Sequence, residues 1–237
     1  MKGNKKQPVD AAKQFINKHY PNCQGAILAG SVVRGEATDT SDLDIVVFDK
    51  LIASAYRESL QDFGWAIEVF VHNWESYKQY FESDRKRARP SLPKMVFEGV
   101  ILKDNGSLEF IKKEAESILQ SGPDKWSDET IRIKRYFITD ALDDFKGCLN
   151  RAEEIFIANT LAELVSEFVL RTNQQWIGTS KWIVRALKQY DEVFAIQFVT
   201  TFDCYYRTGD KEPIIQLVEE VLQPFGGPLF HGFSLGK

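Results

Sequence analysis

The stretch GSVVRGEATDTSDLD, residues 30–44, decides how the first half of the chain is interpreted. It joins a short apolar run at residues 25–30 to a β-branched run at residues 43–48, and both runs are predicted to be strands. Asp42 and Asp44 are two positions apart where the second strand starts, so their carboxylates project to the same side. Two adjacent negative charges repel each other, and a divalent cation such as Mg²⁺ between them is the usual solution.

A third acidic residue strengthens this interpretation. Glu68 lies within the apolar run WAIEVFV, residues 65–71, where an ionised carboxylate is costly unless it is paired or bound to metal. If this strand neighbours the strand that starts at Asp42, the three carboxylates converge and are able to hold two metal ions roughly 3.5–4 Å apart. The alternatives are a solvated turn for the two aspartates and a strand-edge salt bridge for Glu68.

The start of the same stretch has the composition of a phosphate cradle. Gly30 permits close approach of the backbone to a phosphate, and the Ser31 hydroxyl and nearby amides are able to donate to its oxygens. Arg34 adds a forked cation suited to the same group. Metal ligands and a phosphate cradle from adjacent strand ends are what nucleotidyl transfer requires.

The order GS, then Arg-Gly, then Ser-Asp-x-Asp, with an acidic residue on a later strand, resembles the nucleotidyltransferase superfamily that includes DNA polymerase β. A compact catalytic domain followed by a helical domain is similar to its antibiotic-modifying branch, the kanamycin, other aminoglycoside and lincosamide nucleotidyltransferases. The resemblance implies an α+β catalytic domain with a mixed sheet and flanking helices, followed by an all-α helical bundle. It also implies Mg²⁺-dependent transfer of a nucleoside monophosphate, AMP from ATP, to a hydroxyl of a small molecule, and hence antibiotic resistance.

The resemblance also implies roles for individual residues. Ser31 and Arg34 would contact the triphosphate, and Asp42 and Asp44 would bind both metal ions. Glu68 would be the third carboxylate, either a metal ligand or a group near the acceptor hydroxyl. Many family members have Asp at this place, and the extra methylene of Glu68 leaves its role open.

The second half of the chain offers candidates with weaker signals. In some antibiotic-modifying relatives a glutamate of the helical domain is the general base, and Glu163 and Glu167 lie four apart on one predicted helix face. A solvated helix face is the alternative. Lys181 follows Gly178-Thr179-Ser180, which resembles a loop and N-cap whose amides could meet a phosphate. An ordinary helix start is the alternative there.

A helix stop, a proline and a polar turn in SGPD at 121–124 predict a boundary there. The resemblance implies that residues 1–121 are the catalytic domain and that residues 122–237 are a helical substrate-binding domain. In the first domain we expect helices at 9–20, 51–63, 74–81 and 107–120, strands at 25–30, 43–48, 65–71 and 96–102, and a basic loop at 84–90. That loop is either solvated or binds triphosphate or nucleic acid. In the second domain we expect helices at 128–149, 152–176, 180–190, 192–207 and 212–223, then a loop.

Bulk properties restrict the partners. The net charge is −4, from 30 basic and 34 acidic residues, which argues against nucleic acid as a partner. The polar Met1–Gln7 stretch lacks the apolar core of a signal peptide, no apolar run approaches a membrane span, and the three cysteines form no CxxC pair. These features predict a cytoplasmic protein. The resemblance implies that it binds a nucleoside triphosphate and a small-molecule acceptor, and we expect a monomer or a homodimer.

Two other functions remain open at this level. In the first, the enzyme transfers the nucleotide to RNA or to a partner protein. If the acceptor is RNA, the complex should be sensitive to salt. In the second, the protein is a non-catalytic nucleotide sensor. The presence of all three carboxylates argues against a sensor, which does not need them.

Overall fold

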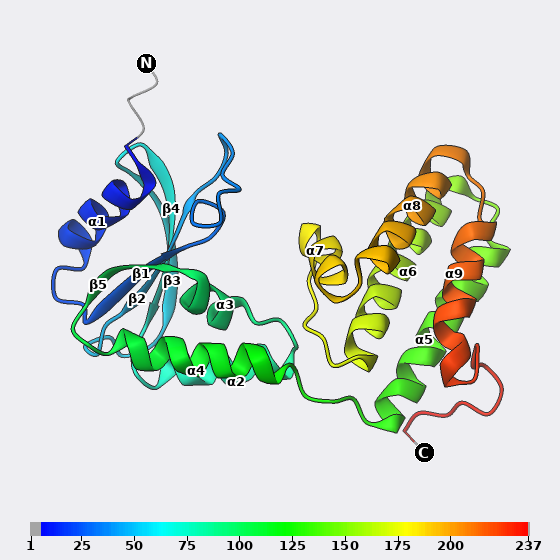
Figure 1. Cartoon of the computed structure of the whole chain (residues 1–237). Coiled ribbons are helices and arrows are strands. Elements are labelled where there is room, and N and C mark those ends of the chain that lie inside the picture. The colour runs from blue at the N-terminus through cyan, green and yellow to red at the C-terminus, as the bar shows by residue number, and fades with distance from the viewer. Residues whose placement is uncertain (1–5, 237) are drawn as a thin grey trace. The chain divides into compact units, whose positions relative to one another are not determined.

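The computed structural model describes residues 6–236 and contains two compact units, which divide between Gly122 and Pro123. Most of the Met1–Gln7 stretch, on which the signal-peptide prediction rests, lies outside the described residues. The first unit holds a mixed sheet with flanking helices and the second is helical, which confirms the predicted fold class (Figure 1).

The sheet of the first unit has the strand order β3-β4-β2-β1-β5. Its strands are β1 (Gly25–Ala29), β2 (Leu43–Phe48), β3 (Tyr56–Asp62), β4 (Trp65–His72) and β5 (Val100–Asp104). Only the central β2–β4 pair is parallel, and the other three pairs are antiparallel. The three carboxylate-bearing positions therefore belong to the start of β2 and to the strand beside it.

Helices cover both faces of this sheet, so that strand residues alternate between two cores (Figure 1). On one face, α1 (Pro8–His19) packs its buried residues against Ile45 and Val69. On the other face, α2 (Ser76–Lys86), α3 (Ser91–Glu98) and α4 (Leu108–Ser121) contribute buried residues around Val46 and Phe48. Asp44 alternates with Ile45 and so lies on the side of the sheet that carries α2–α4.

The predicted helix at 51–63 is wrong, because residues 56–62 form β3. This strand pairs with β4 through a two-residue turn in which Phe63 and Gly64 both have positive φ, 51° and 81°. That geometry matches the right-handed twist of a hairpin. The strand is an exposed edge, so it shows none of the apolar alternation by which strands are predicted.

The predicted strand at 96–102 is also wrong in its first half, and the first three residues of the predicted basic loop at 84–90 belong to a helix. Helix α3 continues to Glu98, and Gly99 then marks the change to β5. A Cβ on Gly99 would lie 2.2 Å from Ile27 Cγ2, so only glycine fits there. Helix α2 extends through Lys86, and buried Asp84 accepts a hydrogen bond from the Leu92 amide at 2.7 Å, which fixes the short link to α3.

The second unit is built from five α-helices and a short 3₁₀ helix in its described residues. They are α5 (Asp128–Gly147), α6 (Arg151–Thr172), α7 (Lys181–Tyr190), α8 (Glu192–Thr208), α9 (Glu212–Leu222) and η1 (Gln223–Phe225). A single apolar core lies between them, with Phe145, Phe168 and Tyr205 among its fully buried side chains. The tail is a loop as predicted, and it is attached to α5 by Arg135, which donates to the Gly227 carbonyl at 2.8 Å.

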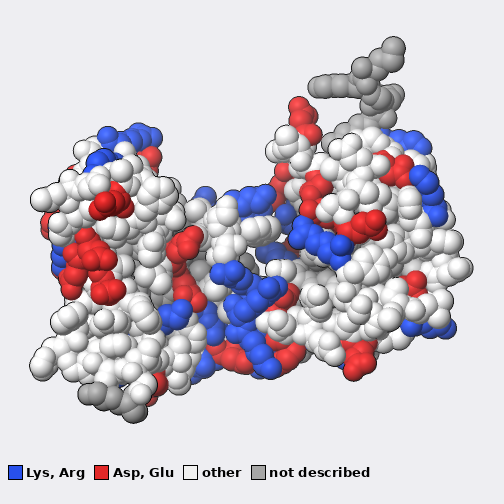
Figure 2. All heavy atoms as spheres, turned by 180° about the vertical axis from the view of Figure 1, so that it is seen from behind, with Lys and Arg blue, Asp and Glu red and all other residues white. Residues whose placement is uncertain are grey.

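The surface bears both signs of charge. In Figure 2, clusters of acidic side chains and clusters of basic side chains both occur on the face in view. Within residues 6–236, no helix combines the length and the apolar character that crossing a membrane requires.

Candidate metal centre

Three carboxylates meet at the edge of the sheet in the first unit. Asp42 directly precedes β2, Asp44 is the second residue of that strand, and Glu68 is aligned with Asp44 in the parallel β2–β4 pair. One oxygen from each side chain lies within 4.8 Å of one oxygen of the other two, and all three residues are half-buried. The condition on which the sequence prediction depended, that the Glu68 strand neighbours the Asp42 strand, is met.

Gly30 lies beside these carboxylates at the end of β1. Its φ is +82°, and a Cβ added to it would lie 2.1 Å from Asp44 Oδ2. Because Ala29 pairs with Asp44 across the two strands, the chain turns directly against that carboxylate. Glycine is thus required here both for the backbone conformation and for the close approach to Asp44.

Ser31 opens a tight loop that leads back to Asp42. The Val33 and Arg34 amides both donate to the Gly30 carbonyl, at 3.3 and 3.4 Å. The Ser31 hydroxyl donates to Ser41 Oγ at 3.1 Å, which joins the two ends of the loop. Ser31 and the candidate metal-ligand positions Asp42 and Asp44 are therefore held together by the same short segment.

Arg34 is engaged with carboxylates in this structure. Its Nε donates to Glu36 at 3.1 Å, and its Nη1 lies 3.6 Å from Glu98 at the end of α3. Glu98 also lies 3.6 Å from Lys94 Nζ. A triphosphate that binds Arg34 would have to replace these carboxylates as its anionic partner, which a multiply charged phosphate group can do.

Arg57 is a site residue that the sequence prediction missed. It lies on β3, and its Nη2 donates to Glu68 Oε2 at 2.5 Å. The predicted alternative for Glu68, a salt bridge at the strand edge, therefore exists alongside the carboxylate cluster. The signal was hidden because Arg57 fell in a segment that the sequence predicts as a helix.

The electrostatics of the cluster suit a divalent cation. Burial raises the pKa of Asp44 to about 6, and the charges of Asp42 and Glu68 add to the rise against the opposing effect of Arg34 and Arg57. The nearby arginines therefore do not fully offset the negative charge of the three carboxylates. Oxygen donors grouped this closely and short of positive charge fit Mg²⁺, which binds through carboxylates and completes its coordination with water and phosphate.

A family comparison agrees with this geometry. The model of the nucleotidyltransferase domain matches residues 9–148, more than half of the chain, and that range includes Gly30, Ser31 and the three carboxylates. The chain belongs to the nucleotidyltransferase domain family. Membership supports nucleotidyl transfer as the general activity, with a nucleotide as one substrate.

Other comparisons add little to this nucleotidyltransferase assignment. The chain is similar to a solved structure of a nucleotidyltransferase-like protein from Exiguobacterium sibiricum, with 11% identity and a TM-score of 0.47. That similarity covers 91% of this chain and 74% of the other. No curated protein matches the chain.

The remaining predicted site residues of this nucleotidyltransferase lie in the second unit. Glu163 is exposed on α6, and Glu167, one turn further along, accepts from Lys134 Nζ at 2.7 Å. Lys181 is the exposed first residue of α7. Ser180 makes no side-chain cap there and has a φ of +53°, so the predicted N-cap hydrogen bond is absent. The roles proposed for these three residues stay predictions.

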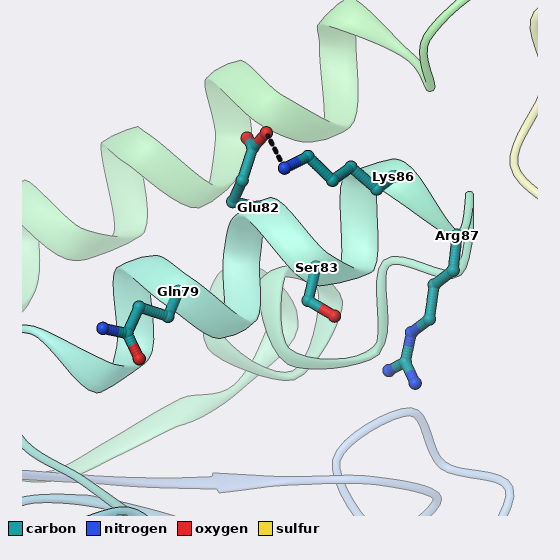
Figure 3. Close-up of a pocket in the computed structure, with 5 residues that line it drawn as sticks. All are labelled: Gln79, Glu82, Ser83, Lys86 and Arg87. Atoms are coloured by element: carbon teal, nitrogen blue, oxygen red, sulfur yellow. Dashed lines mark ion pairs between the residues drawn. The ribbon is translucent and has the colours of Figure 1, made fainter.

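A hollow on α2 is distinct from the carboxylate cluster. It measures about 680 Å³ and is lined by Gln79, Glu82, Ser83, Lys86 and Arg87 (Figure 3). Lys86 lies 3.5 Å from Glu82, and Arg87 pairs with Asp84. Because both cations of the hollow already have acidic partners, it lacks the unbalanced charge that marks the cluster at β2 and β4.

Proposed function

We propose that this protein is a Mg²⁺-dependent nucleotidyltransferase that transfers AMP from ATP to a hydroxyl of a small molecule, an aminoglycoside- or lincosamide-like antibiotic. The observation that carries the proposal is the meeting of Asp42, Asp44 and Glu68 beside the Gly30-Ser31 turn. Family membership supports the transfer itself. The choice of ATP and of an antibiotic acceptor depends on the sequence resemblance alone.

In the proposed reaction, Asp42, Asp44 and Glu68 would hold two Mg²⁺ ions, which would supply neutralising charge to the triphosphate. The Ser31 hydroxyl and Arg34 bind phosphate oxygens and keep the α-phosphorus in position. The acceptor oxygen forms a bond to that phosphorus, the bond to the β-phosphate breaks, and pyrophosphate leaves. A base in the helical unit, Glu163 or Glu167, takes the hydroxyl proton, and Lys181 contacts the nucleotide.

The test is incubation with each of the four labelled nucleoside triphosphates, Mg²⁺ and a panel of aminoglycosides and lincosamides. The wild type should attach label from ATP to at least one acceptor, and Asp44→Asn should not. Glu109→Gln, which removes an exposed carboxylate of the same unit, is the matched control and should behave as the wild type. Pyrophosphate release that is the same in Asp44→Asn and wild type would refute the proposal.

Other outcomes identify other acceptors. Label on RNA or on a protein, with none on the small molecules, would replace the proposed acceptor while keeping the transfer reaction. Metal-assisted triphosphate binding without any transfer would indicate a nucleotide sensor.

A further inference from the structure

Arg57 occupies an unusual place beside the carboxylate cluster. It lies opposite Phe70 in the antiparallel β3–β4 pair, while Ser59 lies opposite Glu68. The guanidinium carbon is 5.0 Å from the centroid of the Phe70 ring, and Nη2 reaches diagonally to Glu68 Oε2 at 2.5 Å. The arginine side chain thus reaches from the edge strand across β4 and places its charge against the Glu68 carboxylate.

This contact restricts what Glu68 is able to offer a metal ion. A carboxylate has two oxygens, and Oε2 of Glu68 is already committed to Arg57. A metal that used both oxygens would have to displace the guanidinium. The positive charge of Arg57 also acts on Asp42 and Asp44, so it opposes the entry of any further cation.

The position of Arg57 allows its contact with Glu68 to break. The Arg57 side chain is 57% exposed and lies on an edge strand, whereas the Glu68 side chain is 26% exposed. A triphosphate carries several negative charges and accepts two parallel hydrogen bonds from a guanidinium. It is therefore a stronger partner for Arg57 than one carboxylate.

We propose that Arg57 is a resident counter-cation, which holds Glu68 and keeps metal affinity low until a triphosphate binds and takes the guanidinium away. Metal and nucleotide then bind cooperatively, because the arrival of the phosphate frees Glu68 for the metal. This inference depends on the proposed function, since it needs a triphosphate at the cluster. Arg57 is a positioning residue in this scheme, because it acts through Glu68.

The opposite role makes the opposite prediction. If Arg57 only orients Glu68 for the metal, as an outer partner orients a ligand, its removal will weaken metal binding. If it is a counter-cation, its removal will strengthen metal binding in the nucleotide-free protein. The sign of the change in metal affinity therefore decides between the two roles.

The experiment is calorimetric titration of the full chain with Mn²⁺, first alone and then with a non-hydrolysable ATP analogue. In the absence of nucleotide, Arg57→Ala should bind Mn²⁺ about three- to tenfold more tightly than wild type, and Arg57→Lys should lie between them. The gain should shrink at high salt, because exposed charges are screened. The tightening of Mn²⁺ binding by the analogue should be smaller in Arg57→Ala than in wild type.

The control is Lys113→Ala, which removes one exposed cation of the same unit that pairs with Glu109 and should leave Mn²⁺ affinity unchanged. Circular dichroism checks folding first, and Arg57→Gln replaces Arg57→Ala if that variant does not fold. Unchanged or weaker Mn²⁺ binding by the Arg57 variant overturns the inference. Absence of metal-assisted analogue uptake by wild type would instead refute the proposed function, so the two failures are distinguishable.

Discussion

Two carboxylates in this protein have opposite electrostatic environments. In the helical unit, Glu154 on α6 is 7% exposed and accepts from Lys211, Arg151 and Tyr205 at 2.8, 2.9 and 2.8 Å. The hydrogen bond from Lys211, followed by those from Tyr205 and Arg151, lowers the pKa of Glu154 to about 2 against the effect of burial. This carboxylate has all the partners it needs within its own unit.

Asp44 in the sheet unit has the reverse arrangement. It is packed beside Gly30 and faces two other carboxylates, and its pKa is raised to about 6, first by burial and then by the charges of Asp42 and Glu68. A carboxylate surrounded by its partners stabilises the fold in which it lies. A carboxylate gathered with others of the same charge destabilises the ligand-free fold, and a bound cation would relieve that repulsion.

The largest effect is expected from Asp44→Asn, which should lower activity and raise stability. Asp44→Asn keeps the shape that fits against Gly30 but removes the charge, so nucleotidyl transfer should fall about a thousandfold, since metal-based stabilisation is worth several kcal/mol. The metal-free variant should nevertheless be more stable than wild type, because repulsion by Asp42 and Glu68 is relieved. Labelled transfer assays and urea unfolding in EDTA measure the two quantities. Loss of both activity and stability would contradict the comparison.

The next largest effect is expected from Glu154→Gln, which should lower stability and leave ligand binding unchanged. Glu154→Gln leaves Lys211 and Arg151 without their acidic partner, and it should lower the free energy of unfolding by about 2 kcal/mol. Metal-assisted binding of a triphosphate analogue should be unchanged, which calorimetry checks. If the substitution removed analogue binding and left unfolding unaffected, Glu154 would belong to a functional site.

The sequence reveals this contrast only in part. Gly30 to Asp44 are close along the chain, so their pattern locates the turn and two of the carboxylates directly. The approach of Glu68 depended on β4 lying next to β2, which a sequence pattern suggests but does not fix. Glu154 gave no signal, because its partner Lys211 lies far along the chain on the residue before α9.

Arg57 was missed for a different physical reason. Its strand is an exposed edge whose residues show no apolar alternation, so the segment was predicted as a helix. Its contact with Glu68 also crosses from one strand to the next, and it therefore follows from register rather than from spacing. The sheet core was predictable from its apolar runs, whereas the polar edge that completes the cluster was not.

The pH dependence of stability should differ in sign between the two sites. Between pH 3.8 and about 6, native metal-free Asp44 holds more protons than the unfolded chain, so its stabilising contribution is lost as pH rises through that window. Between about pH 2 and 4.5 the unfolded chain holds more protons than native Glu154, so that contribution is lost as pH falls. Urea unfolding in EDTA should therefore show the stability advantage of Asp44→Asn growing above about pH 4. The cost of Glu154→Gln should shrink below that pH, and parallel profiles for the two variants would contradict the comparison.

The smallest effects on stability belong to Glu163 and Glu167, which test whether α6 carries only structural carboxylates. Glu167 is paired with Lys134 at a half-buried site, so Glu167→Gln should lower the free energy of unfolding by about 0.5 kcal/mol, and exposed Glu163→Gln by less. Because neither change disturbs the fold, transfer rates of both variants report directly on the proposed base. The true base should lose about a hundredfold in kcat with little change in KM, and the other glutamate should keep wild-type rates. If both variants keep wild-type rates, α6 supplies no base, and the acceptor proton is taken by a group within the sheet unit or by water.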